Sequence, residues 1–271
     1  MGISLFHVLE FVLIGTVVGF LGGYLGIGGG AVLIALLNYW VFPSLGVSPE
    51  VILRLCFGTS LAIIIPSSIA GSLLQTRIGN VNWRVVCLLA LPGILGSFFG
   101  STIAAYLPNW VLRPLFGIIL IIISAQMFWQ KKTPGEAMEP SSPKLSAVLL
   151  VGAAVGLFSG LFGLGGGVIG IPLMVKVFRF PIHQAVGNSI AFVMITSFIG
   201  AAGYVLHGWG DPNLPPHSLG YVHIPGWILA GIPSILLSGL GVKLARKTRP
   251  LRLRRVFALV LGAVGVRMVL S

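Results

Sequence analysis

The sequence predicts an all-α integral membrane protein with two inverted-topology repeats of about five helical segments each. Of its 271 residues, 56% are apolar and only 8% are charged, whereas a soluble domain carries about 25% charged residues. The 38 glycines and 17 prolines lie largely inside apolar runs, where membrane helices tolerate them. Motifs of the first half also recur in the second half in the same order. The lipid bilayer is therefore the expected solvent, and the chain is an expected duplication.

Three motifs define the internal repeat. Their positions are 26–30 and 163–167 for Gly-x-Gly-Gly-Gly, 58–60 and 187–189 for Gly-x-Ser, and 112–127 and 253–268 for a run that begins Leu-Arg and ends in Met. The offsets between copies are 137, 129 and 141, so small insertions relate them. We therefore expect a first membrane repeat at 1–129, a polar cytoplasmic linker at 130–144, and a second, inverted repeat at 145–271.

Each repeat contains five apolar segments, of which the second is short. They cover 5–25, 31–42, 55–75, 85–106 and 114–129 in the first repeat, and 146–162, 168–178, 184–206, 225–242 and 256–270 in the second. A segment of about 12 residues is too short for a hydrocarbon core about 30 Å thick. The first two segments of each repeat should thus form a tilted or re-entrant hairpin, glycine-tipped, that returns the chain to the side it came from.

Basic residues predict the orientation, because short loops rich in Lys and Arg stay in the cytoplasm. The loops with at least two basic residues are 76–84, 130–144, 176–183 and 243–255. The loops with at most one are 43–54, 107–113 and 208–224, and we expect them outside. Equivalent loops then lie on opposite sides, which predicts inverted repeats in the cell (inner) membrane with both termini outside.

The glycine clusters predict a binding site near the membrane midplane. They remove side chains and leave backbone amides free where a helix stops or restarts, and such backbone is tolerated in a bilayer only when protein buries it or a wet cavity adjoins it. Two tips entering from opposite faces would meet, with two helix N-termini favouring an anion. The alternative is that glycine only permits close helix packing. The candidate substrate-binding glycines are Gly28, Gly29, Gly30, Gly165, Gly166 and Gly167.

The Gly-x-Ser motifs predict polar ligands at the start of the next long helix of each repeat. The candidates are Thr59, Ser60, Asn188 and Ser189. Asn188 is the main specificity candidate, because an amide offers both a donor and an acceptor and costs more to bury than a hydroxyl. The alternative is that these side chains bond their own helix or a neighbouring one.

Two ionisable residues are candidate proton or anion relays. Glu10 is the only acid inside an apolar run, and an acid within a membrane is costly enough to suggest a function. His183 borders the second Gly-x-Ser motif and has a pKa suited to proton transfer. The alternative for both residues is a position at the membrane interface.

Composition excludes several other classes of protein. Seven of the 17 Lys and Arg residues lie at 243–255, which indicates topology and not a nucleic-acid surface. Five acids without a cluster predict neither a nucleophilic triad nor a metal site, so we expect no metal, no cofactor and no enzyme, including a lipid-acting one. Cys56 and Cys87 are expected as buried packing residues.

The paired glycine clusters, the Ala-Val-Gly-Asn-Ser run at 185–189 and the closing pattern at 239–259 resemble the sulfite exporter TauE/SafE family over nearly the whole chain. The resemblance implies a secondary transporter that moves sulfite, thiosulfate or a sulfonate such as sulfoacetate across the cytoplasmic membrane, coupled to protons. Members commonly have Gly-Thr-Ser where this chain has Asn188, which leaves the substrate open. An anion channel, a carrier for a small carboxylate and a homodimer remain alternatives.

Overall fold

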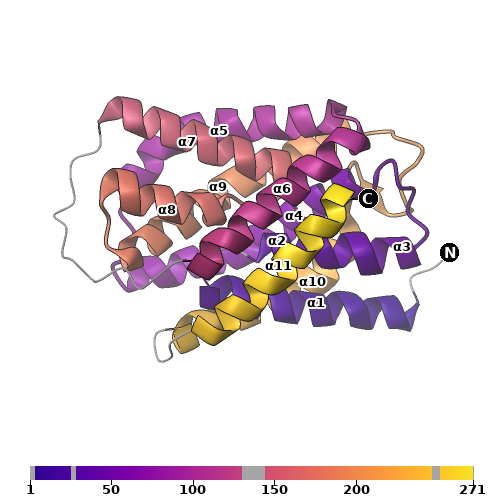
Figure 1. Ribbon diagram of the computed structural model, residues 1–271, viewed down its shortest axis with the longest axis horizontal. Helices are drawn as coiled ribbons and strands as arrows, with labels where there is room; N and C mark the ends of the chain where they lie inside the picture. The colour runs from indigo at the N-terminus through magenta and orange to yellow at the C-terminus, as the bar shows by residue number, and fades with distance from the viewer. Residues whose placement is uncertain (1–3, 26–28, 130–143, 246–250, 271) are drawn as a thin grey trace.

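The structure is a computed structural model that describes residues 4–25, 29–129, 144–245 and 251–270. Long helices run along one axis of the molecule (Figure 1). In order, they are α1 (Leu5–Leu25), α2 (Gly30–Leu36), the π-helix η1 (Leu37–Val41), α3 (Phe42–Ser44), α4 (Ile52–Arg77), α5 (Trp83–Tyr106), α6 (Asn109–Trp129), α7 (Leu145–Phe162), α8 (Gly167–Phe178), α9 (Ile182–His207), α10 (Ile224–Ala245) and α11 (Leu251–Leu270). The antiparallel strands β1 (Ser218–Leu219) and β2 (Val222–His223) precede α10.

The predicted all-α membrane class is confirmed. Seven helices of the described residues are long and apolar enough to cross a membrane. All ten predicted apolar segments are helical, and their observed ends differ from the predicted ones by at most five residues. The small hairpin of β1 and β2 was not predicted, because two-residue strands leave no periodic pattern in the sequence.

Helices α1 and α10 pack in parallel with their backbones in contact. An added Cβ at Gly15 would lie 2.2 Å from the Ala230 carbonyl oxygen, and one at Gly23 would lie 2.1 Å from the Ser238 carbonyl oxygen. Glycine is required at this interface because any side chain would collide with backbone, as in other small-residue membrane interfaces.

Helices α5 and α7 repeat this arrangement in the other half of the molecule. An added Cβ at Gly156 would lie 2.2 Å from the Gly93 carbonyl oxygen, and one at Gly160 would lie 2.0 Å from the Ser97 carbonyl oxygen. The glycines of α7 follow those of α1 with the same offset of 137 that relates the glycine clusters. The two interfaces are therefore repeat-related copies.

The central helices α4 and α9 run antiparallel. Gly71 faces Ile190, whereas Gly58 faces Tyr204. Helices α6 and α11 also pack antiparallel, while α4 runs parallel to α10 and α5 to α9. Each helix of the first repeat consequently runs opposite to its counterpart in the second, which is the geometry that an inverted duplication requires.

The loops gather at two ends of the bundle. One end, called here the hairpin end, holds loops 45–51 and 107–108 and the segment 208–223 with its β-hairpin. The other, called the basic end, holds loops 78–82 and 179–181. Helix α1 begins at the hairpin end, and helix α11 ends there (Figure 1). The loops expected outside thus share one end of the molecule, and the described loops expected inside share the other.

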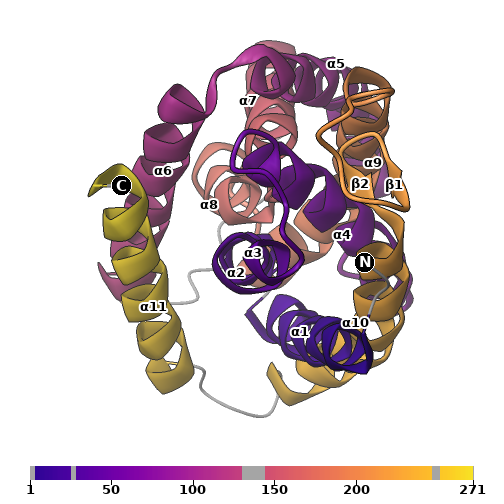
Figure 2. The same ribbon diagram turned by 90° about the vertical axis from the view of Figure 1, so that its right-hand side faces the viewer.

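Short helices occupy the centre of the molecule. Viewed along the bundle, α2, α3 and α8 lie inside the ring of long helices (Figure 2). Chain direction shows that α1 and α2–α3 start and finish at the hairpin end, and that α7 and α8 start and finish at the basic end. The predicted return of each hairpin to its own side is observed.

Candidate functional site

The two glycine tips have the same backbone conformation. Gly29 precedes α2 with φ 63° and Gly166 precedes α8 with φ 75°, both in the left-handed region that favours glycine. An added Cβ would lie 2.7 Å from the Val18 carbonyl oxygen at the first tip and 2.8 Å from Val155 Cγ1 at the second. Close packing, the alternative to binding, therefore already requires glycine at both positions.

The two tips meet in the middle of the bundle. An added Cβ at Gly30 would lie 3.1 Å from Leu164 Cα. Ile64 Cδ1 lies between the two tips: it would be 3.0 Å from an added Cβ at Gly30 and 3.3 Å from an added Cβ at Gly165. Ile64 is halfway along α4. Gly28, also predicted to bind substrate, lies outside the described residues.

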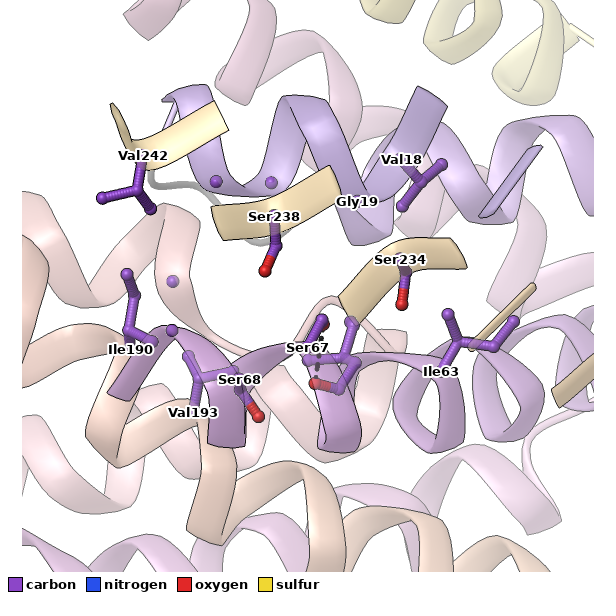
Figure 3. A pocket seen from close by; sticks show the side chains of 15 residues that line it. Val18, Gly19, Ile63, Ser67, Ser68, Ile190, Val193, Ser234, Ser238 and Val242 are labelled. Carbon is purple, nitrogen blue, oxygen red and sulfur yellow. Dashed lines mark hydrogen bonds between the residues drawn. The ribbon is translucent and has the colours of Figure 1, made fainter. Parts of the chain in front are cut away.

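A cavity adjoins the tips, and Gly167, the first residue of α8, lines it. Its volume is about 40 Å³, where one water needs about 10–15 Å³, so it is large enough for a few waters or one small oxyanion. The remaining walls come from α1, α4, α9 and α10 (Figure 3). Most of these residues lie in the halves of their helices nearer the basic end, and Ile63, Ile64 and Ser234 lie at mid-helix, so the cavity lies toward that end.

Four serines supply the polar side chains of the cavity. Ser67 and Ser68 belong to α4, and Ser234 and Ser238 point toward them from α10 (Figure 3). Each hydroxyl donates to a carbonyl three residues earlier in its own helix. Because those carbonyls can also accept the ordinary helical hydrogen bond, a hydroxyl that turned toward a ligand would leave little unsatisfied. These four serines were not predicted from the sequence, although Ser234 and Ser238 share one helix face by their spacing of four.

A hydrogen bond joins two helices at the equivalent positions in the other half of the molecule. By the repeat offsets, Thr196 and Ser197 are the counterparts of Ser67 and Ser68, and Ser97 is the counterpart of Ser238. These three counterparts are buried, and the Ser97 hydroxyl donates to the Thr196 carbonyl at 2.6 Å. The two halves therefore differ at these equivalent positions: a hydrogen bond joins α5 to α9 in one half, whereas the cavity serines of α4 and α10 bond only to their own helices.

The predicted start of a helix at the Gly-x-Ser motifs is wrong. Helices α4 and α9 begin at Ile52 and Ile182, more than one turn before the motifs, because the apolar residues preceding each motif extend the helix. Thr59 accepts a hydrogen bond from the His223 amide at 3.0 Å. Asn188 Oδ1 accepts one from the Asn82 amide at 2.6 Å. Thr59 thus holds His223, which precedes α10, and Asn188 holds Asn82, which precedes α5.

The structure does not bring the two motifs together into one site. Gly58 lies against Tyr204, which is 16 residues after Asn188 on α9 and hence about 24 Å from it along the helix. The Ser60 hydroxyl donates to the Gly163 carbonyl at 2.9 Å at the second tip. Ser189 is buried, and its hydroxyl has no partner among the described residues. A direct role of these side chains in binding stays a prediction.

The two relay candidates occupy very different positions. Glu10 is buried in α1, and both carboxyl oxygens lack a hydrogen-bond partner in the described part of the chain. His183 is exposed in the first turn of α9 at the basic end. Only Glu10 therefore lies in an environment where protonation would matter strongly.

Other sequence predictions concern metals and thiols. The described residues contain no group of three His, Cys, Asp or Glu side chains placed to hold a metal ion. Cys56 is buried as expected, but Cys87 is exposed on α5. The prediction for Cys87 was wrong because an apolar run in a membrane helix does not say which face meets lipid and which meets protein.

Comparisons with known proteins extend over almost the whole chain. The profile of the family described as Sulfite exporter TauE/SafE matches residues 9–268. A probable membrane transporter protein of Methanocaldococcus jannaschii is 30% identical over 260 residues, covering 96% of this chain and 94% of that protein. A probable membrane transporter protein of Haemophilus influenzae is 29% identical, with 97% and 98% covered. The probable membrane transporter protein YunE of Bacillus subtilis is 24% identical, with 95% and 96% covered.

Proposed function

This chain belongs to the sulfite exporter TauE/SafE family and is a multi-pass membrane transporter, and we propose that it carries a small sulfur-containing oxyanion by alternating access. Sulfite, thiosulfate and a sulfonate such as sulfoacetate are the proposed substrates. The observation that carries this proposal is the cavity beside the two glycine tips, bounded by the start of α8. The hairpin end is proposed to face outside, because the described loops of the basic end are richer in Lys and Arg.

The surface of the cavity is mainly apolar in this conformation, and the groups proposed to receive an anion are the start of α8 and the serine hydroxyls. The first-turn amides of a helix lack carbonyl partners within it, and α8 directs this positive end at the cavity through Gly167. The four serine hydroxyls are further donors once they turn from their own carbonyls. No Lys, Arg or His is among the described residues that line the cavity, so the charge of a bound anion has to be met by the start of α8 and the hydroxyls.

The asymmetry between the repeats supports alternating access. A cavity is present near the basic end, while at the equivalent positions nearer the hairpin end a hydrogen bond joins Ser97 of α5 to Thr196 of α9. If each repeat adopted the present conformation of the other, the cavity near the basic end would close. An equivalent cavity would then open toward the hairpin end, beside the same pair of tips. This exchange exposes a bound anion to each side in turn, and it distinguishes a carrier from a channel of the same architecture.

Glu10 is the proposed proton carrier. Its carboxyl group is buried, and neither oxygen has a hydrogen-bond partner among the described residues. Glu10 lies eight residues, about two helical turns, before Val18, which lines the cavity. The distance between them along the helix is about 12 Å. Protonation of Glu10 could then be linked to the occupancy of the cavity.

Flux measurements in liposomes test the substrate and the site. Purified protein should exchange labelled sulfite or thiosulfate, with acceleration by unlabelled substrate on the opposite side. Ser67→Ala combined with Ser234→Ala is expected to raise KM about tenfold or more, since each lost hydrogen bond to a charged group is worth about 1.5–3 kcal/mol. Thr102→Val, at an exposed position of α5, is the matched control. Acceleration by carboxylates alone, or unitary conductance without acceleration, would overturn the proposal.

A second flux experiment tests proton coupling. Glu10→Gln is expected to abolish accumulation driven by a pH gradient while exchange of substrate at equal pH continues. Loss of both activities in a folded variant would place Glu10 in substrate handling instead. Unchanged accumulation would remove Glu10 from the coupling mechanism.

A further inference from the structure

A second, larger pocket lies at the hairpin end, away from the cavity at the tips. It has a volume of about 720 Å³ and lies between η1, the segment 43–53, the start of α6 and the last turn of α11. Helices α6 and α11 form one side of the molecule and face α2 and α3 (Figure 2). Nothing in the transport proposal above uses this pocket.

Two arginines give the pocket its charge. Arg113 of α6 and Arg267 of α11 both line it, and no Asp or Glu is among its described lining residues. Neither arginine forms an ion pair with a described residue. The Arg267 guanidinium carbon lies 4.5 Å from the centroid of the Tyr39 ring, a cation–π contact that fixes the group without neutralising it. Two uncompensated guanidinium groups in one pocket favour an anionic occupant, with a phosphate as the best geometric match.

Polar groups without partners line the same pocket. The Tyr39 hydroxyl and Asn109 Oδ1 are buried and lack a hydrogen-bond partner in the described part of the chain. The Asn109 amide nitrogen is held by the carbonyls of Pro49 and Glu50, so its orientation is fixed. These two groups border the pocket and have unused hydrogen-bonding capacity, which suits a ligand that combines a phosphate with further hydroxyl groups.

An apolar groove continues from the pocket along the protein surface. It runs between α2–η1 and α11, has a volume of about 350 Å³, and shares Tyr39 and Arg267 with the pocket. Its other described walls are mainly Val, Ala and Leu side chains. A small inorganic anion would make no use of this groove, whereas a hydrocarbon chain would fill it. Trp40 and Trp110 are exposed beside the groove and the pocket, and exposed tryptophans mark the interfacial level of a bilayer.

We propose that this pocket and groove form a binding site for an anionic phospholipid. The phosphate lies between Arg113 and Arg267, the headgroup hydroxyls reach Asn109, and one acyl chain lies in the groove against α11. The lipid then joins the pair α6 and α11 to the centre of the molecule through η1. Charge complementarity at one end and an apolar channel at the other identify this class of ligand in preference to a free anion.

Thermal unfolding of the purified, delipidated protein in detergent tests the proposal. A ligand that binds the folded state raises the apparent melting temperature. Phosphatidylglycerol is expected to raise it more than phosphatidylcholine with the same chains, and inorganic phosphate is expected to leave it unchanged. Arg113→Gln and Arg267→Gln should each weaken the apparent affinity for phosphatidylglycerol by roughly fivefold. Arg84→Gln, at the basic end, is the matched control and should leave the affinity unchanged.

A variant of the groove separates a lipid from a free anion. Ala263 is exposed on α11 and lines the groove, so Ala263→Phe should fill it without changing any charge. This variant is expected to lose most of the response to phosphatidylglycerol while its melting temperature without lipid stays close to that of the parent protein. An equal response of the parent to inorganic phosphate, or an unchanged lipid response in the double arginine variant, would overturn the lipid site.

Discussion

Replacement of Gly241 in α10 by alanine tests the close contact between α10 and α1. An added Cβ would lie 2.2 Å from the Phe20 carbonyl oxygen and 2.7 Å from the Tyr24 amide nitrogen. Ordinary contacts begin at 3.4 Å, so the interface has to open by about 1.2 Å, the difference between 3.4 and 2.2 Å. Both atoms belong to helical backbone and cannot rotate away. Overpacking of this kind costs about 1–3 kcal/mol.

Gly239 provides a matched control two residues away in the same helix, because an added Cβ there would meet no atom within 4 Å. Gly241→Ala is expected to lower the melting temperature of the purified protein by several degrees, at roughly 2–4 °C per kcal/mol. Gly239→Ala should change it little. Flux should fall in Gly241→Ala as well, since Gly23 and Ser238 line the cavity from this interface. Equal melting temperatures for the two variants would refute the reasoning.

Three further changes have expected outcomes. Gly166→Ala places a side chain at φ 75° and should cost about 1–2 kcal/mol in a melting experiment, with lower flux. Asn188→Ala orphans the Asn82 amide and should cost about 1–3 kcal/mol, but KM should stay constant, whereas a changed substrate preference would support a direct ligand role. Burial lowers the pKa of His223 to about 4 from 6.5. Because the unfolded chain takes up that proton first, stability should fall by up to about 3 kcal/mol from pH 6.5 to 4, and His223→Gln should flatten this part of the curve.

Helix positions and the side of each loop could be predicted because they depend on local composition. A bilayer requires long apolar segments, so the ends of α1, at Leu5 and Leu25, follow directly from where the apolar run begins and ends. The fixed offset of 137 similarly identified Gly29 and Gly166 as equivalent tips, and both have left-handed backbones. These features need no knowledge of which helices are neighbours.

The lining of the cavity could not be predicted in the same way. Ser67 and Ser234 are 167 residues apart, and only the parallel packing of α4 and α10 puts them in one cavity. Packing has the reverse effect on the Gly-x-Ser motifs. Thr59 and Asn188 are at equivalent positions in sequence, but the antiparallel packing of α4 and α9 keeps them apart. A motif that repeats in sequence therefore marks equivalent positions, which an inverted duplication can place either together or far apart.

The sequence by itself indicated a helical membrane protein with two glycine-tipped hairpins and predicted a duplication, because hydropathy, glycine and repeat offsets act along the chain. The tertiary structure alone decided that the tips meet at Ile64, that serines of α4 and α10 share a cavity, and that Arg113 and Arg267 share a pocket. The physical reason is that helix partners in a membrane are selected by close backbone contact between small residues. Such contact depends on which faces of distant helices fit together.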